Sequence, residues 1–279
     1  MSVTRQLICI TAAQRAGTTA LQHALQGAGI ANFGEVFHPQ PLKDAAGPFL
    51  IFAKENDIRI TDTQTRSGAR AIAQRYLSWL RELAGPRHFL IDVKFNSWCL
   101  LNPWWHYVQN EPLFLTHLKA ERAVIVLVWR ENLIDQLLSQ FIALRFDIWH
   151  DLSPEKVAGR TCRVPVAWLT RMGKAIVRAE IDMLEHLRDY PAKVVMRYED
   201  LFEEGCLSNK FRRALRQVSD IDLPGGSRVH VRQNSAPKRE IVENYNEVID
   251  VLRPLEERRS EIKKGEGRVR KLISLSSRT

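Results

Sequence analysis

Residues 7–25 of this chain read LICITAAQRAGTTALQHAL, and they join an apolar segment, a short polar turn and a helix-forming run. Leu7, Ile8 and Ile10 are typical of a buried strand, whereas the Ala, Leu and Gln residues after Thr19 favour a helix. A strand, a tight turn and a helix in this order form the framework of phosphate-binding loops. The stretch therefore predicts an α/β fold whose first loop faces an anion.

The turn itself carries groups that suit an anion. Gly17 has no Cβ and so allows a ligand to approach the backbone closely. The helix that follows offers unpaired N–H groups and the positive end of its dipole. Arg15 adds a fixed charge with a forked donor, and Thr18 and Thr19 add hydroxyl donors. The same order also occurs in ordinary α/β structure, which stays open as the alternative.

Two well-known nucleotide motifs are missing from the turn. The nucleotide-kinase loop GxxxxGK(S/T) needs a lysine directly before the Thr, where this chain has Gly17. The glycine-rich GxGxxG turn of dinucleotide-binding proteins is also absent. The loop therefore predicts an anion site, and the missing motifs count against both of these ligand classes.

Length and composition favour one large domain. The chain has 279 residues, and we expect a single α/β domain over 1–279 whose segment from about 237 to 279 is helical and basic. No apolar run reaches 18 residues, and the first residues do not resemble a signal peptide. We therefore expect a cytoplasmic protein without a transmembrane helix.

The net charge of +9 indicates an anionic ligand or an anionic surface, or else a solvated surface with a basic tail. No recognised nucleic-acid module is present, so no nucleic-acid partner is expected. The four cysteines are scattered without ligand spacing. We expect free thiols in a reducing compartment and no metal site.

Strands and helices alternate along the chain. Residues 123–129, AVIVLVW, are the clearest strand, because a central parallel strand is apolar on both faces. The pattern predicts a P-loop-like three-layer α/β/α fold with a central, mostly parallel sheet. Further strands are expected within 29–41 and at 89–95 and 193–197, and helices at 65–83, 111–117, 132–144, 166–187, 209–218 and 237–259.

Polar or cationic residues stand at or near the ends of four of these strands. In open α/β sheets, ligands bind beyond the carboxyl ends of the strands. We therefore expect a ligand site formed by residues at these ends, which are Arg15, Lys94, Arg130 and Tyr198.

A second motif is VWRENLIDQLLS at 128–139. A strand places Arg130 at its tip, and the following helix carries Ser139 about two turns on. In the alternative interpretation, Arg130 pairs with Glu131 or Asp135 and Ser139 bonds to its own backbone.

Together with the first loop, this motif resembles the sulfotransferases that use 3′-phosphoadenosine 5′-phosphosulfate (PAPS). The nearest subgroup is the bacterial carbohydrate type that includes the trehalose sulfotransferase. GEVFHP at 34–39, RYEDL at 197–201 and RQNS at 232–235 through EIVENY at 240–245 agree with it. The chain departs from the family at Ala16, where Ser is common, in the spacing from Arg130 to Ser139, which is one residue longer, and in RQN where many relatives have RKG.

The resemblance implies roles for individual residues. Glu35 is the expected general base, His38 is the alternative base, and Arg15 stabilises the leaving bisphosphate. No metal is required. The implied contacts to the 5′-phosphosulfate come from Gln14, Arg15, Ala16, Gly17, Thr18 and Thr19, and those to the 3′-phosphate from Arg130, Ser139 and Arg232.

The subgroup also suggests the acceptor, a sugar hydroxyl of a glycolipid or surface-polysaccharide precursor. Peripheral contact of the basic tail with an anionic membrane surface and formation of a homodimer are compatible with the resemblance. Two alternatives stay open: a P-loop nucleotide-dependent kinase, and a non-catalytic anion- or polysaccharide-binding protein on the same fold. The sequence leaves the acceptor, the oligomeric state and the role of residues 147–163 open.

Overall fold

The computed structural model describes residues 5–38, 48–103, 110–148, 157–224 and 237–264. The chain divides into two compact units, of which the first comprises 1–129 and 180–231 and the second 130–179 and 232–279. Each unit is described by itself. The expectation of a single domain over 1–279 stays a prediction.

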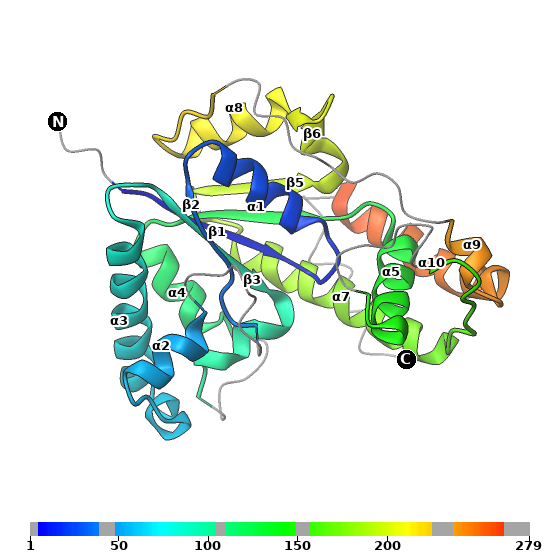
Figure 1. The fold of residues 1–279 in the computed structure, drawn as a ribbon, viewed down its shortest axis with the longest axis horizontal. Helices are drawn as coiled ribbons and strands as arrows, with labels where there is room; N and C mark the ends of the chain where they lie inside the picture. The colour runs from blue at the N-terminus through cyan, green and yellow to red at the C-terminus, as the bar shows by residue number, and fades with distance from the viewer. Residues whose placement is uncertain (1–4, 39–47, 104–109, 149–156, 225–236, 265–279) are drawn as a thin grey trace. The chain divides into compact units, whose positions relative to one another are not determined.

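The first unit is built on a five-stranded parallel sheet with the order β2-β3-β1-β4-β5 (Figure 1). This arrangement confirms the predicted α/β class and central parallel sheet. Register partners such as Cys9 with Ile91 and Cys9 with Ile125 place β1 at the centre of the sheet. The strands are β1 (Leu7–Ala12), β2 (Ala31–Glu35), β3 (Phe89–Lys94), β4 (Val124–Trp129) and β5 (Lys193–Arg197).

Helices cover both faces of this sheet, because alternate residues of each strand point to opposite faces (Figure 1). Ile8 and Ile10 of β1 pack with α1 (Thr18–Gly27) and α8 (Asn209–Val218). Leu7 and Cys9 pack in the core of the other face, which holds α2 (Phe49–Glu55), α3 (Arg66–Ala84) and α4 (Leu113–Ala120). The unit is thus a three-layer α/β/α structure.

The connections between strands fix where a ligand site is expected. The chain leaves β1 through α1 on one face and reaches the edge strand β2. It leaves β3 through α4 on the opposite face and reaches β4 on the other side of β1. The connections that follow β1 and β3 therefore leave the sheet in opposite directions, which is the condition for a ligand crevice at their carboxyl ends.

The sequence did not predict a small hairpin after β5, formed by β6 (Phe202–Glu203) and β7 (Cys206–Leu207). Its two turn residues, Glu204 and Gly205, have φ values of 51° and 77°. Such turns usually carry Asn or Asp at the first position, so Glu204 gave no signal. The described residues of this unit also form short 3₁₀ helices, which are η1 (Ile60–Thr63), η2 (Phe95–Leu101) and η3 (Tyr198–Asp200).

The second unit is helical in the part that the structure describes. It contains α5 (Leu133–Phe146), α9 (Lys238–Ile241) and α10 (Tyr245–Lys264), and α7 (Val166–His186) contributes residues to both units. None of the helices that the structure describes has the length and apolar character needed to cross a membrane.

The helix expected over 237–259 is interrupted between α9 and α10. Val242 forms a parallel bridge with Cys162. The Cys162 N–H donates to the Ile241 carbonyl over 2.8 Å, and the Glu243 N–H donates to the Cys162 carbonyl over 3.0 Å. These bonds take backbone groups that a continuous helix would use, so residues 242–244 turn instead.

Candidate functional site

The loop between β1 and α1 is tightly turned. Arg15 has a φ of 61° and Gly17 a φ of 83°, so two of its residues are left-handed. This conformation is uncommon for a residue with a side chain such as Arg15. Ala16 is buried, and Gly17 is the N-cap residue of α1. The first N–H groups of α1 therefore start directly from a compact turn.

The structure adds a steric reason for glycine at position 17. A Cβ added at Gly17 would lie 2.2 Å from a ring carbon of Tyr198. The space on this side of the glycine is therefore filled by Tyr198 rather than left for a ligand. Tyr198 directly follows β5, so the end of one strand supports the loop that follows another.

A buried lysine lies beside this loop. Lys94, the last residue of β3, donates to the Thr18 hydroxyl at the start of α1 and lies 2.5 Å from Asp92 Oδ2. The same carboxylate oxygen accepts a bond of 2.6 Å from Gln22 Nε2. Thr18 and Gln22 are four residues apart and so share one face of α1. The cluster of Thr18, Gln22, Asp92 and Lys94 thus ties β3 to the first turns of α1.

This cluster supplies a lysine that the loop sequence lacks. A nucleotide-kinase loop carries its lysine directly before the Thr, whereas here the position is Gly17 and Lys94 reaches Thr18 from a neighbouring strand. Lys94 is only 4% exposed, and Asp92 is fully buried. Because a buried charge needs a partner, Asp92 allows the ammonium group to be held at this position. A lysine nitrogen, a threonine hydroxyl and a helix N-terminus form a donor set that fits an anion.

One oxygen of this cluster has no partner. Asp92 Oδ1 is buried and accepts no hydrogen bond from the described residues. A buried acceptor without a donor carries a desolvation cost. A donor group placed beside Asp92 Oδ1 would satisfy this oxygen.

Glu35 lies next to this cluster. It ends β2, and its register partner in β3 is Asp92. Gln14 of the loop donates to Glu35 Oε1 over 3.0 Å. The structure thus brings together the first loop and the carboxylate that the sequence proposed as the base. His38 follows three residues later, and its backbone N–H donates to the Glu35 carbonyl over 3.1 Å.

The surroundings of Glu35 raise the pKa of its carboxyl group above 4.5. Burial is the main cause, because it disfavours the charged form. The charge of Asp92 also raises this pKa, whereas Lys94, the hydrogen bond from Gln14 and His38 lower it. A carboxyl group with a raised pKa is better suited to accept a proton near neutral pH.

Trp98 packs on the face of the sheet opposite to α1 and bonds to the last residues of β1. Its Nε1 donates to Thr11 Oγ1 over 3.1 Å, and that hydroxyl donates to the Val93 carbonyl over 2.9 Å. Trp98 is buried, which agrees with a packing role rather than a sugar-stacking one. Trp104 and Trp105 lie outside the described residues.

The second unit contains Arg130 and Ser139. Arg130 directly follows β4, and its Nη2 lies 2.5 Å from Asp135 Oδ2, which was one of the pairings considered from the sequence. Ser139 is buried on α5. Arg232 lies outside the described residues, so its assignment to the 3′-phosphate stays a prediction.

Helix α10 fixes the backbone that follows Arg130. Arg259, which is buried, donates to the Glu131 carbonyl over 3.2 Å. Glu256 accepts a bond of 3.3 Å from the Ile134 N–H, and Asn132 Oδ1 accepts one of 2.6 Å from the Asp135 N–H. A carboxylate and an N-cap side chain at a helix N-terminus both stabilise it.

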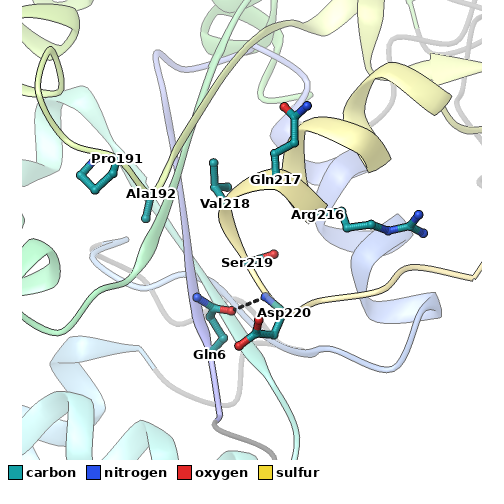
Figure 2. A pocket seen from close by; sticks show the side chains of 8 residues that line it. All are labelled: Gln6, Pro191, Ala192, Arg216, Gln217, Val218, Ser219 and Asp220. Atoms are coloured by element: carbon teal, nitrogen blue, oxygen red, sulfur yellow. Dashed lines mark hydrogen bonds between the residues drawn. The ribbon is translucent and has the colours of Figure 1, made fainter.

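A hollow of about 440 Å³ lies at the other end of the strands. Figure 2 labels the eight residues that line it. Gln6 and Ala192, which line it, directly precede β1 and β5, and the Asp220 N–H donates to Gln6 over 3.2 Å. Ligands of parallel sheets bind at the carboxyl ends of the strands, not at these amino ends. We therefore assign the candidate site to the loop at Arg15 and not to this hollow.

Within the described residues, no three His, Cys, Asp or Glu side chains are grouped so that they could hold a metal ion. The four cysteines are free thiols. Comparison with protein-family models finds no match for this chain, and comparison with curated proteins finds none either.

Two members of the cluster were not identified from the sequence. Asp92 interrupts the apolar strand at 89–95, and a charged residue in a buried strand is itself a signal, because unpaired charges are rarely buried. Its spacing of two from Lys94 places both side chains on one face of the strand. Gln22 gave no comparable signal, because its role depends on the packing of α1 against β3.

Proposed function

We propose that this protein is a sulfotransferase that moves a sulfuryl group from PAPS to a hydroxyl group. The observation that carries the proposal is the convergence of Lys94, the first turn of α1 and Glu35 around one loop. The first two suit an anionic donor, and Glu35 suits an acceptor that must lose a proton. The family resemblance of the sequence adds the 3′-phosphate contacts of Arg130, Ser139 and Arg232.

In this proposal the chain acts by binding, orienting and removing one proton. The acceptor oxygen forms a bond to sulfur while the bond between sulfur and the bridging phosphate oxygen breaks, as in phosphoryl transfer. Glu35 takes the proton of the acceptor hydroxyl. Arg15, Lys94 and the N–H groups at the start of α1 stabilise the negative charge that develops on the leaving bisphosphate.

A nucleotide-dependent kinase is the second candidate. The position of Lys94 beside Thr18 favours a kinase, because a lysine at this point also suits a nucleotide phosphate. Glu35 and the sequence motifs at 128–139 and 232–245 agree with the sulfotransferase family, and for this reason we propose a sulfotransferase rather than a kinase.

The acceptor class, the P-loop-like nature of the fold and the cytoplasmic location belong to the same proposal. The expected acceptor is a sugar hydroxyl of a glycolipid or surface-polysaccharide precursor. The acceptor follows from the sequence resemblance, peripheral membrane contact is suggested by the basic C-terminal segment, and a homodimer is compatible with the family.

Ligand-dependent thermal unfolding tests the proposal. A ligand that binds only the native state at about 100 times its dissociation constant adds roughly 2.7 kcal/mol to the free energy of unfolding. Adenosine 3′,5′-bisphosphate should therefore raise the midpoint, whereas ATP with Mg²⁺ should change it little. The opposite order would favour the kinase. No shift with either ligand would favour a non-catalytic protein.

A further inference from the structure

Three charged side chains form a cluster at the amino end of α5. Arg130 Nη2 lies 2.5 Å from Asp135 Oδ2, and Lys238 Nζ contacts Asp135 Oδ1, so each carboxylate oxygen has its own cation. The Lys238 side chain is 10% exposed, and the side chains of Arg130 and Asp135 are about one quarter exposed, at 27% and 25%. Two cations and one carboxylate leave a net positive charge in a partly buried position.

The backbone around this cluster is held independently of the carboxylate. Asn132 caps α5 through the Asp135 N–H, and Arg259 and Glu256 bond to the backbone of Glu131 and Ile134. Replacing the Asp135 carboxylate therefore leaves these backbone contacts in place. Arg130 and Lys238 each contact a different oxygen of Asp135, so the two cations are spaced to hold two oxygens of one anionic group.

We propose that Asp135 is an internal competitor for the ligand. Its carboxylate holds Arg130 and Lys238 when no anion is bound, and it releases them to a phosphate group. This inference rests on the proposed function, in which Arg130 binds the 3′-phosphate, and it adds Lys238 as a second phosphate ligand. A phosphate dianion brings more charge than the carboxylate it displaces, so Asp135 selects for a doubly charged group over a singly charged one.

Calorimetric titration of the full chain tests this role. The proteins are the wild type, Asp135→Asn and the control Asp147→Asn, which removes the same charge at the other end of α5. The probes are inorganic phosphate, adenosine 3′,5′-bisphosphate and adenosine 5′-phosphate. Because competition lowers the apparent affinity, Asp135→Asn should bind phosphate and the bisphosphate about fivefold tighter or more. The affinity for adenosine 5′-phosphate should stay constant.

Two further variants locate the effect. Arg130→Ala added to Asp135→Asn should abolish the gain, and Lys238→Gln alone should weaken phosphate binding. Equal or weaker phosphate binding by Asp135→Asn would overturn the inference, because Asp135 would then merely orient Arg130. An equal gain in Asp147→Asn would also overturn it, since the effect would be one of net charge. If Asp135→Asn binds inorganic phosphate more tightly while none of the three proteins binds the bisphosphate, the competition by Asp135 is supported and the proposed function fails.

Discussion

At the scale of single residues, Glu35 is the group that removes the acceptor proton in the proposed mechanism. It lies beside a loop that suits an anion, and burial raises the pKa of its carboxyl group. Glu35→Gln keeps the side-chain oxygen that accepts from Gln14 but cannot take a proton. We expect this variant to bind adenosine 3′,5′-bisphosphate like the wild type and to lose about 10²–10⁴ in the rate of sulfuryl transfer.

The alternative base provides the comparison for this prediction. His38→Asn should reduce the rate far less than Glu35→Gln when both are measured by single-turnover transfer to a sugar acceptor. A larger loss in the His38 variant would assign the base to His38. Unchanged turnover in Glu35→Gln would remove Glu35 from the mechanism.

The raised pKa of Glu35 also predicts a dependence of stability on pH. An acid whose pKa is higher in the folded state contributes stability below its unfolded pKa, and this contribution is lost as the pH rises through the folded pKa. The free energy of unfolding of the wild type should therefore fall relative to Glu35→Gln as the pH rises above 4.5. Urea unfolding of both proteins across this range measures the difference, and a constant difference would contradict the shift.

The pair of Asp92 and Lys94 shows why a buried charge needs its partner. Removing one member of a buried ion pair typically costs about 3–5 kcal/mol, whereas replacing both by apolar residues costs much less. Asp92→Ala should therefore lower the free energy of unfolding by about this amount. The double variant Asp92→Leu with Lys94→Met should be clearly more stable than Asp92→Ala.

Urea denaturation provides the measurement, with Asp57→Asn as the control because the side chain of Asp57 is 92% exposed and asparagine tolerates its φ of 49°. The control should change stability by less than about 0.5 kcal/mol. A double variant no more stable than Asp92→Ala would show that the two side chains do not depend on each other.

At the scale of elements, the loop between β1 and α1 needs glycine at position 17 for two physical reasons. Gly17 has a φ of 83°, and its Cβ position is occupied by Tyr198. Gly29, just after α1, has a φ of 91° with open space around it. Gly29→Ala therefore measures the backbone strain alone, about 1–2 kcal/mol. Gly17→Ala should cost a further 1–3 kcal/mol, roughly the cost of overpacking.

Combining Gly17→Ala with Tyr198→Ala tests the steric part of this cost. Since the smaller side chain removes the collision, the double variant should lose less stability than the sum of the two single changes. Denaturant midpoints of the four proteins give the coupling energy. Strict additivity would mean that Tyr198 does not press on the loop.

The sequence predicted the elements with strong apolar periodicity and missed those fixed by contacts. The bounds expected for β5 and α8, 193–197 and 209–218, are those of the structure, because a short β-branched run and a strongly amphipathic run each have one stable arrangement. The break at 242–244 depends on Cys162, about 80 residues earlier, and no local pattern can carry such information. The same holds for the contact of Lys94 with Thr18, which needs β1 and β3 to be neighbours.

At the scale of the whole molecule, the chain passes between the two units at 129/130, 179/180 and 231/232. Helix α7 contributes residues to both units, and helix formation is cooperative along a continuous segment. The candidate site residues are divided between the two units, since Arg15 belongs to the first unit and Arg130 to the second. The prediction of a single domain therefore means, in physical terms, that the two units unfold together.

We expect the two units to unfold in one cooperative transition. To test this, a core residue is substituted in one unit and the stability of the other unit is measured. Leu137, on α5 in the second unit, is fully buried, so Leu137→Ala should cost about 2–5 kcal/mol. In a single cooperative domain, native-state hydrogen exchange at the amide of Ile10 in β1 should accelerate by the same factor as at Ile142 in α5. Leu80→Ala on α3 provides the reciprocal experiment, because it should accelerate exchange at Ile142. If Leu137→Ala changes exchange only in the second unit, the chain folds as two domains, and the free energy that a ligand adds to one unit would not protect the other.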